Sequence, residues 1–230
     1  MYWNKQIIKK ITLTGLFLAL AIVADLMGQF MPFNGFLKFN LSLIFILANF
    51  VISGFWWGLL ILFLLFALGP SYSSLGYEPA GLLGHGMLLI SQASFIFVFL
   101  LSRQIIQKYT KNESLSIKKQ ILKLLISLTI ASIIASAFLI IINLFISTPA
   151  FFYLLKFAPD AKFTTIATMY HDNFRPLFFF IPNYYLGAGV VFGVFNLLNY
   201  SINSIILFLV LAFSLKTKLF EQAKTNNSTL

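Results

Sequence analysis

Long runs of apolar residues without a single charge constrain this chain more than any other feature of its sequence. The runs LTGLFLALAIVA, LLILFLLFAL and SIILFLVLAF are examples. A helix of about 20 apolar residues crosses a bilayer. Of the 230 residues, 60% are hydrophobic and 10% are charged, whereas soluble domains carry about 25% charged residues. We therefore expect an all-α integral membrane protein, which excludes soluble enzymes, secreted disulfide-rich domains and nucleic-acid-binding proteins.

The net charge of +10 comes from basic residues gathered in a few segments, so it does not indicate a nucleic-acid partner. The sequence has no Cys, which excludes disulfides, thiolate metal sites and Cys nucleophiles. Its basic start continues into apolar sequence without a small-residue cleavage site, which indicates a first helix rather than a signal peptide. We expect one domain over residues 1–230, with a short polar cytoplasmic tail from about 217 to 230.

Six membrane-spanning helices account for the hydrophobic pattern and for the charges. We place them at about 11–31, 41–53, 56–69, 81–102, 119–146 and 185–214. The interval 41–69 is one long helix or two short ones broken at Ser53-Gly54, and the charges decide between these. Basic residues precede the first helix, fill the 103–123 connection and follow the last helix: Lys5, Lys9, Lys10, Arg103, Lys108, Lys111, Lys118, Lys119, Lys123, Lys216, Lys218 and Lys224. Lys and Arg favour the cytoplasmic side, so we predict six spans in the cell membrane with both termini cytoplasmic.

Three connections then face outward, at about 32–40, 70–80 and 147–184. A connection as long as the third is usually functional in a compact protein, and here it could cover a site that is open to the outside. The alternative is a flexible linker, but the aromatic runs FFYLL, PLFFF and PNYY favour an ordered segment.

The sequence gives little support for catalysis or for driven transport by this chain alone. It has no phosphate-binding G-x-x-x-x-G-K-[ST] run, and Glu78, His85, His171 and Asp172 form no recognisable catalytic set. Asp25 is the only carboxylate in a predicted span. We expect snorkelling or a partner such as Lys38 to reduce the free-energy cost of placing this charge in the membrane. We therefore expect a protein that is not an enzyme and has no catalytic residue, metal or cofactor.

Binding of a small molecule remains, because polar side chains gather at the predicted external ends of the helices. Amides offer donors and an acceptor together, and aromatic rings offer stacking faces, so this set suits a heterocycle. Its members are Gln29, Asn34, Lys38, Asn40, Ser71, Tyr72, Tyr77, Glu78, Asn143, Tyr153, Asn183, Tyr184 and Asn196.

Four stretches resemble the substrate-binding S components of energy-coupling factor (ECF) vitamin transporters, which are six-helix proteins of about this length. They are KKITLTGLFLALAIVADLM, FLKFNLSLIFILANFVISGFWWGLL, GYEPAGLLGHGMLLISQASFIF, and INLFISTPAFFY together with VFGVFNLLNYSINSIILFLV. The last is similar to riboflavin-type members, which have an Asn before a Pro-aromatic segment and later a P-F-N-x-x-K-G motif. Here Asn143 and Phe195-Asn196 match, while Asn199 takes the Lys position.

The resemblance implies that Asn143, Asn196 and the residue at position 199 contact the vitamin. The nearby polar residues Tyr153, Lys38, Asn40 and Glu78 complete the expected site. Riboflavin is favoured as cargo rather than as a cofactor, and folate, thiamine and pantothenate are the alternatives. The resemblance further implies a transmembrane coupling protein and two cytoplasmic ATPases as partners. A stand-alone channel or secondary carrier is the alternative from another class.

Gly15 and Ala19 are four residues apart, so they share one face of the first helix. Small residues at this spacing allow a second helix to approach closely in lipid. Such pairs also pack helices within one protein, but the family resemblance favours an interface with the coupling protein. Ala21 and Ala24 could instead serve internal packing.

Overall fold

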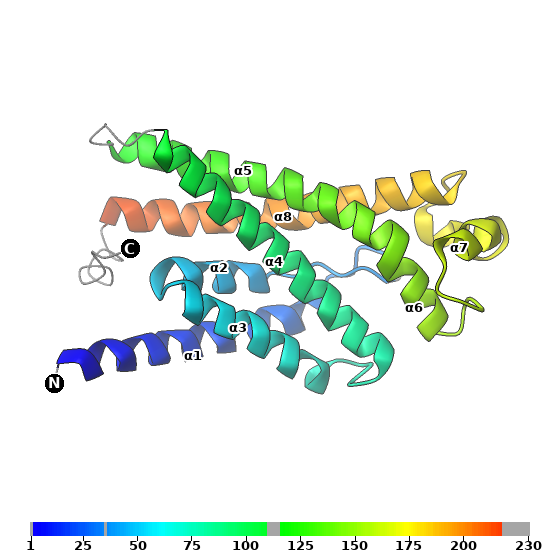
Figure 1. Ribbon diagram of the computed structural model, residues 1–230, viewed down its shortest axis with the longest axis horizontal. Coiled ribbons are helices and arrows are strands. Elements are labelled where there is room, and N and C mark those ends of the chain that lie inside the picture. Colours follow the sequence, from blue (N-terminus) through cyan, green and yellow to red (C-terminus); the bar gives the residue numbers. More distant parts are fainter. Residues whose placement is uncertain (1, 35, 110–115, 218–230) are drawn as a thin grey trace.

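The structure is a computed structural model that describes residues 2–34, 36–109 and 116–217, and it is built from helices (Figure 1). The α-helices are α1 (Tyr2–Gly28), α2 (Ser42–Ile52), α3 (Phe55–Leu68), α4 (Pro79–Lys108), α5 (Ile117–Ile142), α6 (Thr148–Leu154), α7 (Phe163–Met169) and α8 (Tyr184–Thr217). Short 3₁₀ turns are η1 (Gly69–Tyr72) and η4 (Arg175–Phe178), and π-helical turns are η2 (Asn143–Ser147) and η3 (Tyr170–Phe174). The expectation of an all-α protein is confirmed for the described residues.

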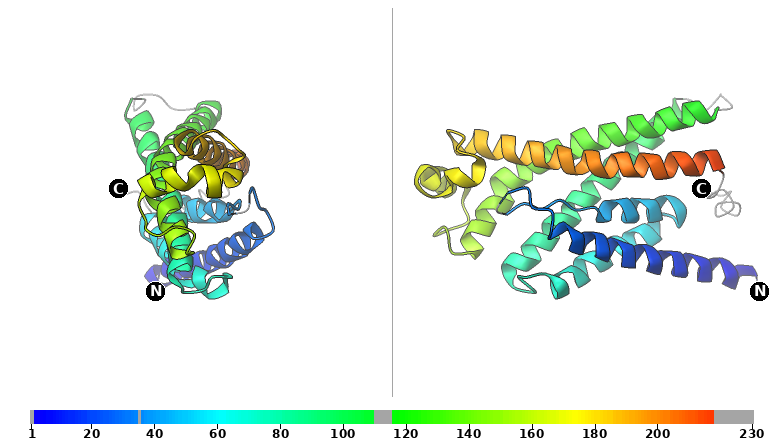
Figure 2. Two further views of the ribbon diagram at one scale, coloured as in Figure 1. Left: turned by 90° about the vertical axis from the view of Figure 1, so that its right-hand side faces the viewer. Right: turned by 180° about the vertical axis from the view of Figure 1, so that it is seen from behind.

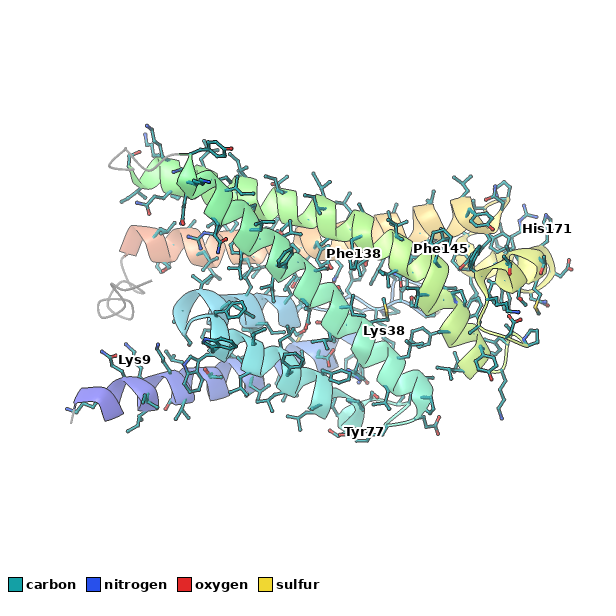
Figure 3. The ribbon with its side chains drawn as sticks, viewed as in Figure 1. Lys9, Lys38, Tyr77, Phe138, Phe145 and His171 are labelled. Atoms are coloured by element: carbon teal, nitrogen blue, oxygen red, sulfur yellow. The ribbon has the colours of Figure 1, made fainter. Side chains whose placement is uncertain are left out.

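The helices run back and forth along the long axis of the molecule (Figure 1). The beginning of α1, the end of α4, the beginning of α5 and the end of α8 lie at one end, which we name the basic end. The connections after α1 and α3, and the segment from η2 to η4, lie toward the other end, which we name the distal end. Lys9 and His171 mark the two ends in Figure 3.

Five helical segments are long and apolar enough to cross a membrane: Lys5–Gly28, Phe55–Tyr72, Pro79–Lys108, Ile117–Leu154 and Tyr184–Leu215. α2 is as apolar but has 11 residues, which is about 16 Å of helix against a hydrocarbon core of about 30 Å. The predicted break at Ser53-Gly54 is confirmed, because α2 ends at Ile52 and α3 begins at Phe55. Gly54 has φ +103°, a conformation that favours glycine.

The connection predicted at 147–184 differs most from expectation, because much of it is helical. α5 continues through η2 into α6, so that the helical run reaches Leu154. Pro149 in the first turn of α6 has no amide hydrogen, and its ring would clash with a carbonyl in a regular helix. The wider η2 turn lies just before Pro149, where such a helix needs to be adjusted. The predicted tail at 217–230 lies almost wholly outside the described residues.

The buried side chains form two clusters along the long axis. The larger one joins α1, α2, α3, α4, α5 and α8, and Phe95, Phe99 and Leu128 are among its fully buried members. The smaller one lies at the distal end around Tyr170, Phe178 and Tyr184. Many large apolar side chains are exposed on the outer surface of the bundle, including Phe138 on α5 and Phe145 on η2 (Figure 3). That is the pattern of a bundle whose outer surface faces lipid rather than water.

Most basic residues of the described segments lie at the basic end, where α1 and α5 begin and α4 and α8 end (Figure 1). They are Lys5, Lys9, Lys10, Arg103, Lys108, Lys118, Lys119, Lys123 and Lys216, whereas Lys38, Lys156, Lys162 and Arg175 lie outside this end. Lys111, Lys218 and Lys224 lie outside the described residues. The spatial clustering is the arrangement that the positive-inside rule requires of a cytoplasmic end.

Candidate functional site

A network of hydrogen-bonded polar side chains lies inside the helical bundle, and Asp25 in the last turn of α1 is its charged member. The Tyr72 hydroxyl donates to Asp25 Oδ2 over 2.7 Å, and the Asn40 side-chain nitrogen donates to Asp25 Oδ1 over 2.5 Å. Lys38, which we expected as a partner, is exposed, and the described residues hold no ion pair between it and Asp25. Two neutral donors therefore hold this carboxylate, rather than a cation.

Asn40, in the connection between α1 and α2, is the centre of this network. Its backbone N–H donates to Asn199 Oδ1 over 2.9 Å, and its backbone oxygen accepts from Asn203 Nδ2 over 2.8 Å. Its side-chain oxygen accepts from the backbone N–H and the hydroxyl of Ser42, at the first turn of α2. Asn40 thus joins α1, α2 and α8, which are far apart in the sequence but adjacent in space. The right-hand view of Figure 2, in which the molecule is seen from behind, shows this connection extending toward α8.

The network extends into α4 through Gln92, whose side-chain nitrogen donates to the Ser42 hydroxyl over 2.5 Å. Gln92 and Ser42 are both buried. Gln92 lies near the middle of α4, and Asn199 lies near the middle of α8. The network is therefore deep within the bundle rather than at its distal surface.

Three asparagines of α8 lie on one face, because Asn196, Asn199 and Asn203 follow the i, i+3, i+7 spacing of a helical stripe. Asn199 and Asn203 are hydrogen-bonded to the backbone of Asn40. The Asn196 side-chain nitrogen and the Asn203 side-chain oxygen are buried without a hydrogen-bond partner among the described residues. A buried unpaired amide costs free energy and marks a place where a further partner would be stabilising.

His85 of α4 borders the network on its Tyr72 side. Its ring meets the Tyr72 ring edge-to-face, with centroids 6.2 Å apart. The imidazole lies against the backbone of Gly69, where any side chain larger than hydrogen would overlap it. His85 Nδ1 is buried without a hydrogen-bond partner in the described residues, and Asp25 is near enough to act on His85 electrostatically.

Four phenylalanines pack together next to these polar residues. Phe39 and Phe195 directly precede Asn40 and Asn196 in the sequence, and their ring centroids are 5.4 Å apart. Phe33 packs against Phe39, Phe195 and Phe179, with centroid distances of 5.8, 5.4 and 6.0 Å. The connection after α1 and the segment after η4 thus bring aromatic rings to the asparagine face of α8. We name Phe33, Phe39, Phe179 and Phe195 the phenylalanine cluster.

The distal segments are ordered by their own contacts. Asn34 donates to the backbone oxygen of Leu177. This bond joins the connection between α1 and α2, which we name the first connection, to η4. The Tyr170 hydroxyl donates to the backbone oxygen of Ile181, and burial raises the pKa of Tyr170, while the charge of Arg175 acts the other way. Phe179 and Phe180 both have positive φ, at 53° and 60°. Two adjacent residues of this kind are unusual without glycine and indicate a conformation imposed by tertiary packing.

The predicted site residues divide into those that join the network and those that do not. Asn40 and Asn199 join it, and Asn196 lies on the same face of α8 as Asn199. Asn143 does not, because its nitrogen donates to the Leu139 backbone oxygen and its oxygen accepts from Ser147. The remaining three predicted residues, Lys38, Glu78 and Tyr153, are exposed.

The small residues of α1 face in two directions. Gly15 and Ala19 are exposed, and a Cβ on Gly15 would meet nothing within 4 Å. Ala21 and Ala24 are buried, at 0% and 5% exposure. Gly15 and Ala19 therefore lie on an exposed face of α1, whereas Ala21 and Ala24 pack internally.

Sequence reasoning missed Ser42, Gln92 and Asn203, and it expected Lys38 rather than Asn40 and Tyr72 as a partner of Asp25. Two features of the sequence could have indicated this network. A carboxylate within an apolar span is by default a functional candidate, and the asparagine spacing on α8 defines one face. The partners of Asp25 were hidden, because Asn40 and Tyr72 come from connections whose path the sequence does not specify.

No family model matches the sequence, and no solved structure matches it. The chain is 24% identical over 202 residues to a protein of Mycoplasma pneumoniae (strain ATCC 29342 / M129 / Subtype 1) named "Uncharacterized protein MG350.1 homolog". The match covers 85% of this chain and 83% of that protein. The similarity therefore extends over most of both chains.

Proposed function

We propose that the chain crosses the cell membrane six times, with the basic end in the cytoplasm and the distal end outside. Five helices have the length and apolarity for a span, and the shorter α2 would form the sixth. An even number of crossings agrees with the start of α1 and the end of α8 lying at the same end (Figure 1). The basic residues at this end support its cytoplasmic placement.

We further propose that the protein is a non-enzymatic S component that captures a B vitamin from outside, with riboflavin the first candidate. Folate, thiamine and pantothenate are the alternatives. The observation that carries this proposal is the buried, unpaired amide of Asn196 beside the phenylalanine cluster. Aromatic faces stack on a planar heterocycle, and amides pair with its ring carbonyls and N–H groups.

The binding role falls on the asparagine face of α8 and on Asn40. Asn196 would donate to a ligand carbonyl and so gain the partner that it otherwise lacks. Asn199 and Asn40 would line the inner wall and hold the first connection in place. Asn143 would act indirectly, since its amide stabilises the η2 turn beneath the distal segments.

Transport would require a transmembrane coupling protein and two cytoplasmic ATPases, because the sequence has no phosphate-binding loop of its own. The exposed face of Gly15 and Ala19 supports α1 as the contact for the coupling protein. Small residues on an exposed helix face allow close helix packing in lipid.

The absorbance spectrum of the purified protein tests the ligand proposal most directly. A yellow preparation with flavin bands, lost on unfolding and dialysis, is the expected result. Titration with riboflavin, thiamine, folate and pantothenate then ranks the candidates. Failure of all four to bind would contradict the vitamin-binding proposal.

A stand-alone ion-coupled carrier is the second candidate, and Asp25 favours it, because carboxylates inside helical bundles often carry coupling ions. Reconstitution in vesicles without any ATPase distinguishes the two candidates. Ligand uptake driven by an ion gradient under these conditions would establish the carrier and exclude the S component.

A further inference from the structure

Asp25 is the one carboxylate among the network residues, and few ionisable groups surround it. α2 and α3 pack against α1 and contain no ionisable side chain. η1 contributes Tyr72, and α4 contributes His85. α8 faces the network with Asn199 and Asn203, which are neutral. None of these neighbouring elements therefore places a permanent positive charge beside Asp25 that would keep it ionised.

The hydrogen bonds of Asp25 connect its charge to the position of the first connection. Asn40 is the residue by which this connection is fixed to α8 and to α2, and its side-chain nitrogen donates to Asp25. Tyr72 donates to the other carboxylate oxygen. A hydrogen bond to an ionised carboxylate is about twice as strong as one between neutral groups. The anchoring of Asn40 thus depends on the charge of Asp25.

We propose that Asp25 is a proton-binding site that controls the first connection. Ionised Asp25 accepts from Asn40 and Tyr72 and keeps Asn40 bonded to Asn199 and Asn203 of α8. When Asp25 binds a proton, both bonds become neutral, one donor must turn away or accept, and the hold on Asn40 weakens. The expected change in the equilibrium between the held and the released connection is about fivefold.

A proton fits this site better than a metal cation, because the oxygens around Asp25 are already used. The Asn40 side-chain oxygen accepts two hydrogen bonds from Ser42, and the Ser42 hydroxyl accepts one from Gln92. A cation would have to break these bonds to find oxygen ligands, whereas a proton needs one carboxylate oxygen.

Proton binding at Asp25 is separate from the identity of the ligand, so the two proposals can fail independently. If the first connection covers a vitamin site, as its Phe33 and Phe39 in the phenylalanine cluster suggest, acid would favour release of the vitamin. If the protein is a carrier, the same site would couple transport to protons.

Spin labelling tests the proposal without any ligand. The sequence contains no Cys, so Lys38→Cys provides a single exposed attachment point for a nitroxide on the first connection. Its mobility is measured in detergent from about pH 8 to about pH 3, a range that extends below the pH at which Asp side chains ordinarily titrate, with choline in place of sodium. We expect the fraction of mobile label to rise in acid, by the roughly fivefold change in the equilibrium given above.

The isosteric variant Asp25→Asn should show, at every pH, the larger mobile fraction that the unaltered protein reaches only in acid. Asp172→Asn is the matched control, because Asp172 is an exposed distal carboxylate, and it should titrate as the unaltered protein does. His85→Gln should also keep the transition, which separates Asp25 from the neighbouring imidazole. An equal transition in Asp25→Asn, loss of it in His85→Gln, or no transition at all would overturn the proposal.

Two further measurements keep the test decisive. If Asp25→Asn does not fold, Tyr72→Phe is the alternative variant, because it removes one donor to Asp25 and keeps the carboxyl group. It should displace the midpoint of the transition. An unchanged midpoint would overturn the proposal. Repeating the titration in sodium separates a proton from a metal cation. A held state that forms with sodium at constant pH would replace the proton by a monovalent cation.

Discussion

The side-chain nitrogen of Asn203 lies 2.8 Å from the backbone oxygen of Asn40, across 163 positions of the sequence. One turn earlier on α8, Asn199 accepts from the backbone N–H of the same residue. Two side chains of the last long helix therefore satisfy both backbone groups of one residue in the first connection. A connection that enters a helical bundle needs such partners, because water is not there to supply them.

Removal of the Asn203 amide should destabilise the whole bundle. Asn203→Ala leaves the Asn40 carbonyl buried without a partner, and we expect a loss of about 1–3 kcal/mol in the free energy of unfolding. Reversible unfolding in mixed detergent measures it. Gln104→Ala is the matched control, because this exposed amide lies on α4 near the basic end and its loss should change little. Equal effects of the two variants would show that the bond to Asn40 contributes nothing.

Asn196 and Asn143 should respond differently to replacement by Leu, if the protein binds a vitamin as proposed. Asn196→Leu removes a donor that has no partner within the chain, so it should weaken ligand binding by roughly 5- to 150-fold and leave stability unchanged or improved. Asn143→Leu removes two local hydrogen bonds and should mainly lower stability. Ligand titration and thermal unfolding of both variants check this. Unchanged affinity in Asn196→Leu would place the site elsewhere.

Asn199→Lys restores the residue that riboflavin-type S components have at this position, but the structure predicts a cost. Lys has no acceptor, so the backbone N–H of Asn40 loses its partner, at about 1–3 kcal/mol. The variant should unfold at a lower temperature than Asn199→Asp, which keeps an acceptor oxygen. Improved flavin binding by Asn199→Lys would nevertheless support the riboflavin-type alignment.

The two faces of α1 should respond in opposite ways to bulky substitutions. If the protein is an S component as proposed, Ala19→Trp adds a ring on an exposed surface, so folding and ligand binding should persist while co-purification with a coupling protein is lost. Ala21→Trp is the control at a fully buried position, where a ring cannot be accommodated and folding should fail. Normal co-purification of Ala19→Trp would exclude this face as the interface.

The orientation of the bundle can be measured with single cysteines in this Cys-free chain. Lys162→Cys at the distal end should react in intact cells with a maleimide that does not cross membranes. Lys118→Cys at the basic end should react only after the membrane is opened. The reverse pattern would invert the topology, and labelling of both sites in intact cells would contradict a membrane crossing by the helical run Ile117–Leu154 between them.

Helix position was predictable because it depends on local properties. Apolar length located the long helices, although α1 begins at Tyr2 rather than at about 11 and the run that starts with α5 ends at Leu154 rather than at about 146. Gly54 marked the break between α2 and α3. The segment from 147 to 184 was less predictable, because its helices are short and gain their stability from packing at the distal end. Tyr170, Phe178 and Tyr184 form that packing, and their contacts join parts of the chain that periodicity does not relate.

The sequence by itself determined that this chain forms a bundle of apolar helices with most of its basic residues at one end, since hydropathy and charge are properties of each segment taken alone. Only the tertiary structure decided that Asp25 meets Asn40 and Tyr72, and that Asn199 and Asn203 hold Asn40. The physical reason is that these contacts depend on the rotation of each helix about its axis and on its sliding along its neighbours. Both are fixed by side-chain packing between segments that are distant in the sequence.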